Sequence, residues 1–142
     1  MLVDTILQTK GAQVHTLSET GTLADAVALL NANNIGAVVI TGTAGAIAGI
    51  LSERDIVRRL GGNPAHAMAL PIMDCMTRGV VTCTAATPIA EVMERMTQRR
   101  IRHMPVIEND QLIGIISIGD VVKHKIEEAE REAAELREYI AS

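Results

Sequence analysis

Two pairs of side chains in this chain combine a hydroxyl with a carboxylate at the same spacing. Ser52 and Asp55 form the first pair, and Ser117 and Asp120 form the second, in stretches that match in register 65 residues apart. An ionised carboxylate can accept hydrogen bonds from both hydroxyls of a ribose, and a serine hydroxyl can bind a ribose or phosphate oxygen. The two pairs are therefore candidate nucleotide-binding groups.

The same residues also permit a purely structural interpretation. Ser-x-x-Asp is a capping box, in which each side chain accepts a hydrogen bond from the other residue's backbone N–H at the start of a helix. Each pair follows a glycine-containing apolar strand, and the turn from a strand into a helix is where ligands gather in open α/β folds. On the sequence alone, both interpretations stay open.

A phosphate group would need a cation close to these pairs. The run 99–103 is basic, and Arg102 and His103 enter a strand that we expect to pair with the strand leading to Ser117. These two side chains are the candidates for binding a phosphate near Ser117 and Asp120, in the second of the two matching units of the chain. The alternative for the basic run is a solvated helix end.

The first unit lacks those cations. Gly36 and Ala37 stand at the corresponding positions, so Arg54, next to Asp55, is the candidate there. The two units therefore cannot be equivalent, and we expect the better phosphate site to lie at Asp120.

A purine would have to be held by aliphatic side chains and backbone groups, because the chain has one tyrosine and no tryptophan or phenylalanine. Candidates for an aliphatic slot are Val14, Val38, Ile47 and Ile50 in the first unit and Val81, Met104, Pro105 and Ile115 in the second. Thr16 and either Thr82 or Thr84 are candidates for contacts with the ribose or base edges. Ordinary core and strand roles remain the alternative for all of them.

The elements that must position these residues occur twice. Residues 14–60 predict the order strand, helix, strand, strand, helix, and residues 80–126 repeat it, each after a short helical lead-in at 3–7 and 73–77. Apolar periodicity predicts a helix over 23–33 and another from Thr87-Pro88. Hairpins are predicted from 37–40 with 47–51 and from 104–107 with 112–116.

The last helix is predicted to extend beyond its counterpart in the first unit. Apolar residues recur in steps of three and four at Ile126, Ala129, Ala133, Leu136 and Ile140. This heptad pattern is typical of a helix that packs against a partner. The alternative is a helix end that lies on its own domain.

Composition excludes several classes of protein. The chain has 142 residues, 48% of them hydrophobic, and a formal charge of −4, which argues against nucleic-acid binding. Cys75 and Cys83 lack metal-ligand spacing, so we expect free thiols in a reducing compartment. No run of about 18 apolar residues and no signal-peptide pattern is present. We expect a cytoplasmic protein that does not bind membranes.

Catalytic signatures are also missing from the sequence. The four histidines are scattered, and neither a Ser/His/Asp set, a Cys/His set nor a G-x-x-x-x-G-K-[ST] loop is present. We therefore predict that the protein is not an enzyme.

The combination of G-h-h-S-x-x-D turns (h, a hydrophobic residue) twice in register with an R-x-R-H-M-P-V strand resembles a tandem pair of cystathionine-β-synthase (CBS) domains, or Bateman module. The likeness covers about residues 2–126 and is nearest to stand-alone bacterial pairs. It implies a mixed α/β (α+β) fold of two β-α-β-β-α repeats packed as a pseudo-two-fold pair, with an extended C-terminal helix. The implied divisions are repeat 1 with its lead-in (2–62), repeat 2 with the linker (63–126) and a charged helical tail (127–142).

The resemblance also implies a function. Such modules bind adenosine-containing ligands in two clefts, with AMP the first expectation, ATP, ADP or NAD(H) as others, and S-adenosylmethionine less favoured. By position, Asp55 and Asp120 would bind ribose, Ser52 and Ser117 would assist, and Arg102, His103 and Arg54 would meet phosphate. A homodimer that reports its ligand state to an unidentified protein partner is implied, and a ligand-free assembly module acting through the helical tail is the alternative.

Overall fold

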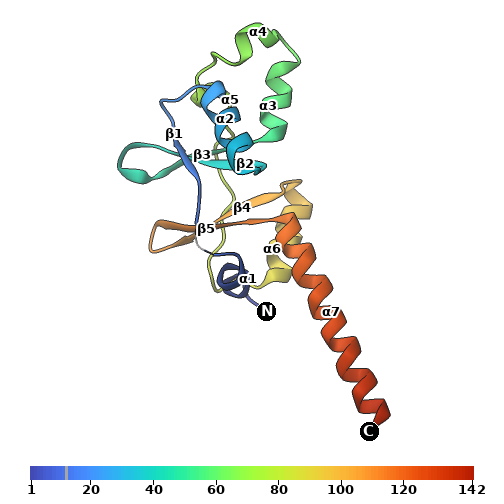
Figure 1. Ribbon diagram of the computed structural model, residues 1–142. Helices are drawn as coiled ribbons and strands as arrows, with labels where there is room; N and C mark the ends of the chain where they lie inside the picture. Colours follow the sequence, from blue (N-terminus) through green and yellow to red (C-terminus); the bar gives the residue numbers. More distant parts are fainter. Residues whose placement is uncertain (12) are drawn as a thin grey trace.

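A computed structural model describes residues 1–11 and 13–142 and shows two similar units side by side (Figure 1). Repeat 1 (residues 14–60) contains β1 (Thr16–Ser18), α2 (Leu23–Asn33), β2 (Ala37–Thr41), the 3-10 turn η1 (Thr43–Gly45), β3 (Ile47–Ser52) and α3 (Glu53–Leu60). Repeat 2 (residues 80–126 and the tail that continues it) contains α6 (Ile89–Arg99), β4 (His103–Glu108), β5 (Gln111–Ser117) and α7 (Ile118–Ala141). Three helices lie outside the repeats: α1 (Val3–Lys10), α4 (Pro64–Ala67) and α5 (Ile72–Cys75). The predicted mixed α/β fold with two repeats and a long last helix is confirmed.

Each repeat is built around an antiparallel hairpin. β2 pairs with β3, and β4 pairs with β5, with Ala37 opposite Ser52 and His103 opposite Ser117. Because each serine ends the second strand, both Ser-x-x-Asp turns lie at the open end of a hairpin. The strand that enters the hairpin stands beside each turn.

The predicted first strand of repeat 2 is wrong. β1 runs parallel to β2 over three residue pairs, whereas the corresponding segment of repeat 2 makes a single bridge between Cys83 and Val106. Cys83 donates its N–H to the Pro105 carbonyl, and Ile107 donates to the Cys83 carbonyl. Pro105 has no N–H, so the preceding rung of a parallel ladder cannot form.

The helix starts agree with the capping patterns in the sequence. Thr22 caps α2 in a box with Asp25, and Ser52 and Ser117 cap α3 and α7. The caps at Thr22, Ser52 and Ser117 place these helix starts at a defined residue because capping boxes satisfy N–H groups that the helix itself leaves free. At α6, Pro88 takes the N-cap position rather than the expected place in the first turn, and it makes no side-chain cap hydrogen bond.

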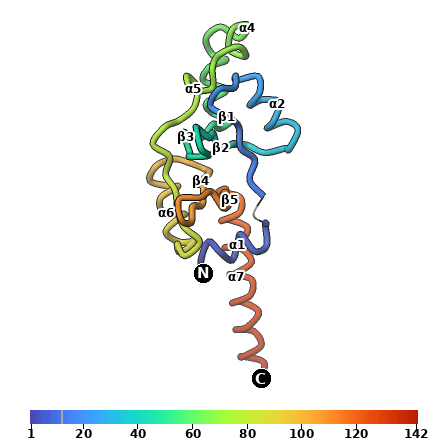
Figure 2. Tube along the Cα trace, turned by 90° about the vertical axis from the view of Figure 1, so that its left-hand side faces the viewer, coloured from blue at the N-terminus to red at the C-terminus, as the bar shows by residue number. Residues whose placement is uncertain are grey.

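The two lead-in helices each pack in the core of the other repeat. Val3, Ile6 and Leu7 of α1 belong to the apolar cluster of repeat 2, which includes β4, β5 and α6 side chains. Ile72 and Cys75 of α5 belong to the cluster of repeat 1. Figure 2 shows α1 beside β5 and the start of α7, while α5 lies with the helices of repeat 1. The hydrophobic cores thus follow a different division from the sequence boundaries 2–62 and 63–126.

The second half of α7 projects away from both repeats (Figure 1). The cysteines are free and buried, Cys75 with repeat 1 and Cys83 with repeat 2. Burial raises the pKa of the Cys83 thiol to about 11. In the described part of the chain, none of the helices has the length and hydrophobicity needed to cross a membrane.

Candidate functional site

The turn at the start of α7 holds Asp120 in place through short contacts. The Ser117 N–H donates to Asp120 Oδ2 at 2.9 Å, and the Asp120 N–H donates to Ser117 Oγ at 3.1 Å. Lys10, at the end of α1, places its Nζ 2.7 Å from the same Oδ2 and 2.9 Å from the Ile115 carbonyl oxygen. The turn is therefore a capping box whose carboxylate also forms an ion pair with Lys10 of α1, the lead-in helix that precedes repeat 1 but packs on repeat 2.

Asp120 keeps one oxygen available. Partial burial raises its pKa, but the hydrogen bonds from Lys10 and Ser117 and the charge of Lys10 outweigh burial and lower the pKa below its ordinary value. The carboxylate is thus ionised at neutral pH. Within residues 1–11 and 13–142, every hydrogen bond that the Asp120 side chain accepts is made to Oδ2, and Oδ1 accepts none. With 23% of the side chain exposed, Oδ1 can accept a ligand hydroxyl.

Asp55 is more fully engaged than Asp120. Its Oδ2 accepts hydrogen bonds from the Ser52 N–H at 2.9 Å and the Ser52 hydroxyl at 3.1 Å, and Oδ1 accepts one from the Thr77 hydroxyl at 3.2 Å. The residue is 8% exposed. A ribose at this turn would have to displace Thr77, so the two turns differ in the acceptor oxygens that they offer.

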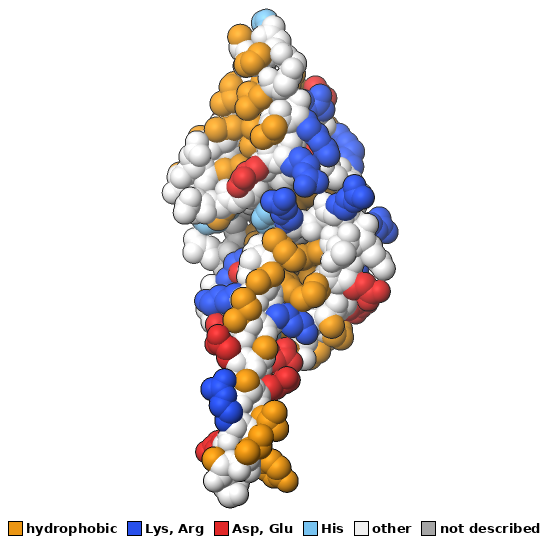
Figure 3. All heavy atoms as spheres, turned by 90° about the vertical axis from the view of Figure 1, so that its right-hand side faces the viewer, with side chains coloured by type: hydrophobic (Ala, Val, Ile, Leu, Met, Phe, Trp, Pro, Cys, Tyr) orange, Lys and Arg blue, Asp and Glu red, His pale blue; other side chains and the backbone are white. Residues whose placement is uncertain are grey.

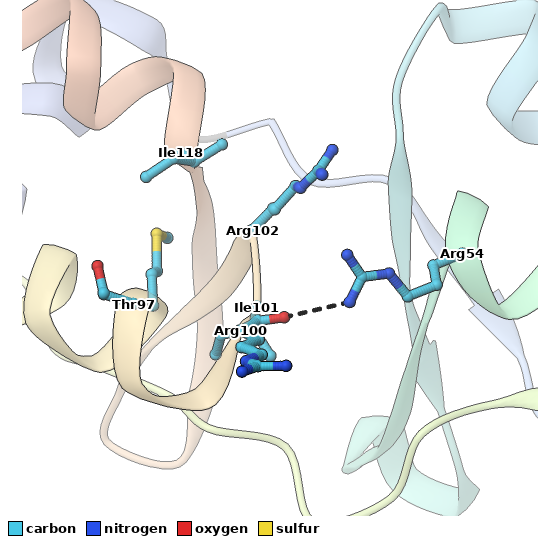
Figure 4. A pocket seen from close by; sticks show the side chains of 7 residues that line it. Arg54, Thr97, Arg100, Ile101, Arg102 and Ile118 are labelled. Atoms are coloured by element: carbon cyan, nitrogen blue, oxygen red, sulfur yellow. Dashed lines mark hydrogen bonds between the residues drawn. The ribbon is translucent and has the colours of Figure 1, made fainter.

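A cavity of about 430 Å³ lies where the two repeats meet, and three arginines line it (Figure 4). It is lined by Arg54, Met96, Thr97, Arg100, Ile101, Arg102 and Ile118. Arg54 reaches across from α3 of repeat 1, with its Nη1 3.5 Å from the Arg100 carbonyl oxygen of repeat 2. Among the residues that the structure describes, no carboxylate lines this cavity. Three guanidinium groups without a counter-charge make an anion-binding environment.

The sequence placed Arg54 and Arg102 in separate clefts, whereas the structure brings both to this cavity. Asp120 instead lines a neighbouring hollow of about 170 Å³ with Ile6, Thr9, Lys10, Lys123, His124 and Glu127. Ile118 and Asp120 lie two residues apart in the first turn of α7. That turn therefore stands between the arginine cavity and the carboxylate.

His103 lies between the repeats at the start of β4. A Cβ atom on Gly36 would fall 3.5 Å from the His103 ring and 2.7 Å from Glu53 Oε1, so the glycine leaves room for both side chains. Burial, and secondarily the charge of Lys10, lower the pKa of His103 from its ordinary value. The imidazole is thus neutral at pH 7 and can offer a hydrogen bond but not a permanent charge.

The remaining predicted site residues lie outside both cavities. Val38 and Pro105 are buried, and Val38 belongs to the core of repeat 1. Thr82 uses its carbonyl to accept a hydrogen bond from Arg95, Thr84 hydrogen bonds with Thr87, and Thr16 is exposed at the start of β1. These five residues keep their sequence-based site roles as predictions only.

Sequence reasoning missed Lys10, Thr77 and Arg100. Lys10 is the last residue of α1 and Thr77 follows α5, and they reach the two aspartates across 110 and 22 residues of sequence. Nothing in the pattern showed that α1 crosses to the other repeat. Arg100 lies within the basic run, and its left-handed φ of 55° at the C-cap of α6 presents its carbonyl to Arg54.

Comparison with known proteins assigns the family. The model of the CBS domain matches twice, at residues 7–62 and 72–127. The chain belongs to the CBS domain family. Both matches contain one Ser-x-x-Asp turn, and the arginine cavity is shared between them.

Relatives with solved structures have the same fold. The CBS-domain containing protein ATU1752 from Agrobacterium tumefaciens is 41% identical, with a TM-score of 0.85 over 88% of this chain and 99% of that one. The CBS domain pair of protein MJ0100, solved in complex with 5′-methylthioadenosine and S-adenosyl-L-methionine, is 25% identical, with a TM-score of 0.80 over 90% of this chain and 98% of that one.

A curated relative is longer than this chain. The mitochondrial CBS domain-containing protein CBSX3 of Arabidopsis thaliana is 37% identical over 84% of this chain, which spans 60% of that protein. A second, CBSCBSPB2 of the same plant, is 27% identical, and the match spans 24% of its length.

Proposed function

We propose that this CBS pair is a regulatory module that binds an adenosine-containing nucleotide at the junction of its repeats. The observation that carries the proposal is the cavity to which repeat 1 contributes Arg54 and repeat 2 contributes Arg100 and Arg102. Phosphate oxygens are the natural partners of grouped guanidinium groups. The related MJ0100 pair, which binds two adenosine compounds, supports adenosine as the remainder of the ligand.

The charge of the cavity favours phosphorylated ligands. AMP is the first candidate, followed by ATP, ADP and NAD(H), because each carries phosphate. S-adenosylmethionine brings a sulfonium cation toward three arginines, so it is a weaker candidate. Asp120, which lines the neighbouring hollow and has Oδ1 unoccupied in the described structure, is the proposed ribose acceptor of a ligand that extends past the first turn of α7. The neutral His103 supplies a hydrogen bond.

The proposed role is binding rather than catalysis. The arginine cavity is lined by guanidinium, hydroxyl and apolar side chains, which bind an anion but supply no general base. A ligand that touches both repeats stabilises one relative packing of the repeats to the extent that it binds that packing better. We infer that a homodimer carries this change to an unidentified protein partner, and we place the protein in the cytoplasm.

Calorimetric titration of nucleotide-free protein with AMP, ATP, NADH and S-adenosylmethionine tests the proposal. Arg102→Met and Arg54→Met should each weaken AMP binding by about tenfold to a hundredfold, the loss expected for one charge-assisted hydrogen bond. Arg99→Met is the matched control, because Arg99 is the last residue of α6, belongs to the same basic run as Arg102 and does not line the cavity. Asp120→Ala should weaken all adenosine ligands alike.

Two results would contradict this proposal. Equal losses in Arg99→Met and Arg102→Met would show that the effect is general surface charge. Heat below detection with all four ligands would favour the alternative, a ligand-free assembly module acting through the helical tail, which the exposed apolar residues of α7 support.

A further inference from the structure

Apolar side chains follow one face of α7 far beyond the body of the molecule. Val122, Ile126, Leu136 and Ile140 are between 47% and 74% exposed. Figure 3 shows hydrophobic groups along this helix and at its free end. Exposed large apolar residues in a row are unusual on an unpartnered helix and mark an interaction surface.

The spacing of this face fits a two-stranded coiled coil. The residues Val122, Ile126, Ala129, Ala133, Leu136 and Ile140 alternate in steps of four and three, which assigns them to the d and a positions of a heptad. The stripe is about 27 Å long at 1.5 Å per residue. Two alanines near its middle allow close approach but bury little area, so the association should be reversible and concentration-dependent.

The flanking charges identify the occupant of this face. In this heptad frame Lys125 and Glu132 take g positions, and Glu130 and Arg137 take e positions. In a parallel dimer each g residue meets the e residue five positions later in the partner. The resulting pairs, Lys125 with Glu130 and Glu132 with Arg137, are both of opposite charge.

The antiparallel arrangement of the same helices lacks this complementarity. When all six apolar layers overlap in antiparallel order, e positions face e and g positions face g. Glu130 then meets its own copy, Glu132 meets its own copy, and Lys123 meets Arg137. All three pairings are repulsive, and like charges at these positions select against an orientation.

We propose that the tail of α7 forms a parallel, in-register two-stranded coiled coil with the tail of a second copy of this chain. Within one chain, Lys125 makes only a long contact of 3.9 Å with Glu128 in the described structure, so its ammonium group can turn to the partner helix. The proposal is independent of nucleotide binding, and either can fail without the other.

Sedimentation velocity over a range of concentrations tests the surface. The double variant Leu136→Asp/Ile140→Asp should weaken self-association by more than about tenfold, since it removes two buried apolar layers. The control Arg131→Ala/Glu138→Ala changes the outer face of the same turns and should leave association unchanged. Both variants alter exposed residues, and far-UV circular dichroism with thermal unfolding checks that the body stays folded. Equal self-association of the double variant and the native chain would overturn the proposal.

Cysteine crosslinking tests the orientation. In a parallel dimer the two copies of residue 140 are adjacent, whereas in the antiparallel overlap they lie about 27 Å apart. Under mild oxidation, Ile140→Cys should form a disulfide-linked dimer much faster than Glu138→Cys, which places its thiol on the outer face. The native thiols are buried and do not compete. Crosslinking at equal rates in the two variants, or in neither, would overturn the parallel assignment.

Discussion

At the scale of single residues, Asp55 and Asp120 occupy the same position in the two repeats but have different partners. Asp55 receives hydrogen bonds on both carboxylate oxygens, including one from Thr77. Asp120 receives all of its hydrogen bonds on Oδ2, with Lys10 among the donors. The second carboxylate therefore combines a stable position with an unoccupied acceptor oxygen, as the proposed ribose site requires.

Replacing Lys10 should change the pKa values of both Asp120 and His103. Lys10→Met removes the hydrogen bond and charge that lower the pKa of Asp120, and it removes the charge that helps burial lower the pKa of His103. Both pKa values should rise. NMR titration of the Asp120 carboxyl carbon and the His103 ring protons measures them. Lys123→Met is the control, because Lys123 lines the same hollow without a hydrogen bond to Asp120.

The same substitution should remove a contribution to stability that depends on pH in a defined direction. A carboxylate with a lowered folded-state pKa stabilises the fold above its unfolded pKa, near 4, and this contribution is lost as the pH falls through the folded pKa. Lys10→Met should therefore lower the free energy of unfolding by about 0.5–1 kcal/mol at pH 7, as expected for a partly exposed pair. The difference from the native chain should shrink below about pH 4. A deficit that stays constant with pH would contradict an ionic origin.

The sequence singled out some residues of the candidate site and not others. Ser52, Asp55, Ser117 and Asp120 could be selected because capping and ribose binding both act through local spacing. The meeting of Arg54 with Arg102 depends on how the repeats pack, which the local pattern does not encode. Lys10 was missed for the same reason, since its partner lies 110 residues away.

At the scale of elements, each lead-in segment crosses a hairpin strand at a glycine. A Cβ atom on Gly49 would lie 2.8 Å from both the Thr77 carbonyl oxygen and Met76 Sδ, whereas one on Gly114 would lie 2.5 Å from Leu7 Cδ2. The first obstacle includes backbone, and the second is the end of a flexible side chain. A side chain added at Gly49 would therefore meet a backbone atom that cannot move easily, whereas one added at Gly114 would meet a side chain that can.

Alanine at these two glycines should have unequal effects. Gly49→Ala should lower the free energy of unfolding by about 1–3 kcal/mol, the usual cost of overpacking, and Gly114→Ala should cost less because Leu7 can change its rotamer. Urea unfolding measures both. Gly62→Ala is the control, since the nearest atom there is 3.7 Å from the added Cβ. A larger loss at Gly114 than at Gly49 would contradict the packing argument.

Helices and hairpins were predicted well because their signals are local. The capping box and apolar periodicity that predict α2 lie at and within that helix. The apolar runs that predict β2, β3, β4 and β5 lie within the strands themselves. The first strand of repeat 2 was predicted wrongly because its ladder depends on the partner strand, where Pro105 cannot donate a hydrogen bond. Strand pairing is a property of two segments, and a pattern within one segment cannot report it.

At the scale of the whole molecule, the exchanged lead-ins couple the two cores. Ile6 of α1 is 5% exposed and packs in repeat 2, while Ile72 of α5 is fully buried in repeat 1. A loss of packing in either helix should therefore appear in the repeat that it packs on, rather than in the repeat that follows it in the sequence.

Hydrogen exchange can separate the two cores. Ile6→Ala and Ile72→Ala should each cost about 2–5 kcal/mol of stability. The amides of β4 and β5 should lose protection first in Ile6→Ala, and those of β2 and β3 should lose it first in Ile72→Ala. Each variant is the control for the other. Identical exchange patterns in the two variants would show that the cores open as one unit.

The exchange of lead-in helices also bears on how such a chain arose by duplication. A polypeptide with one lead-in and one repeat has no lead-in from elsewhere to complete its core, unless a second molecule donates one. The present chain has the arrangement of a domain-swapped dimer whose two subunits were fused end to end. In this arrangement an ancestor encoding a single unit would need a second copy to supply its lead-in helix, and fusion would leave its two Ser-x-x-Asp turns, until then identical, free to diverge.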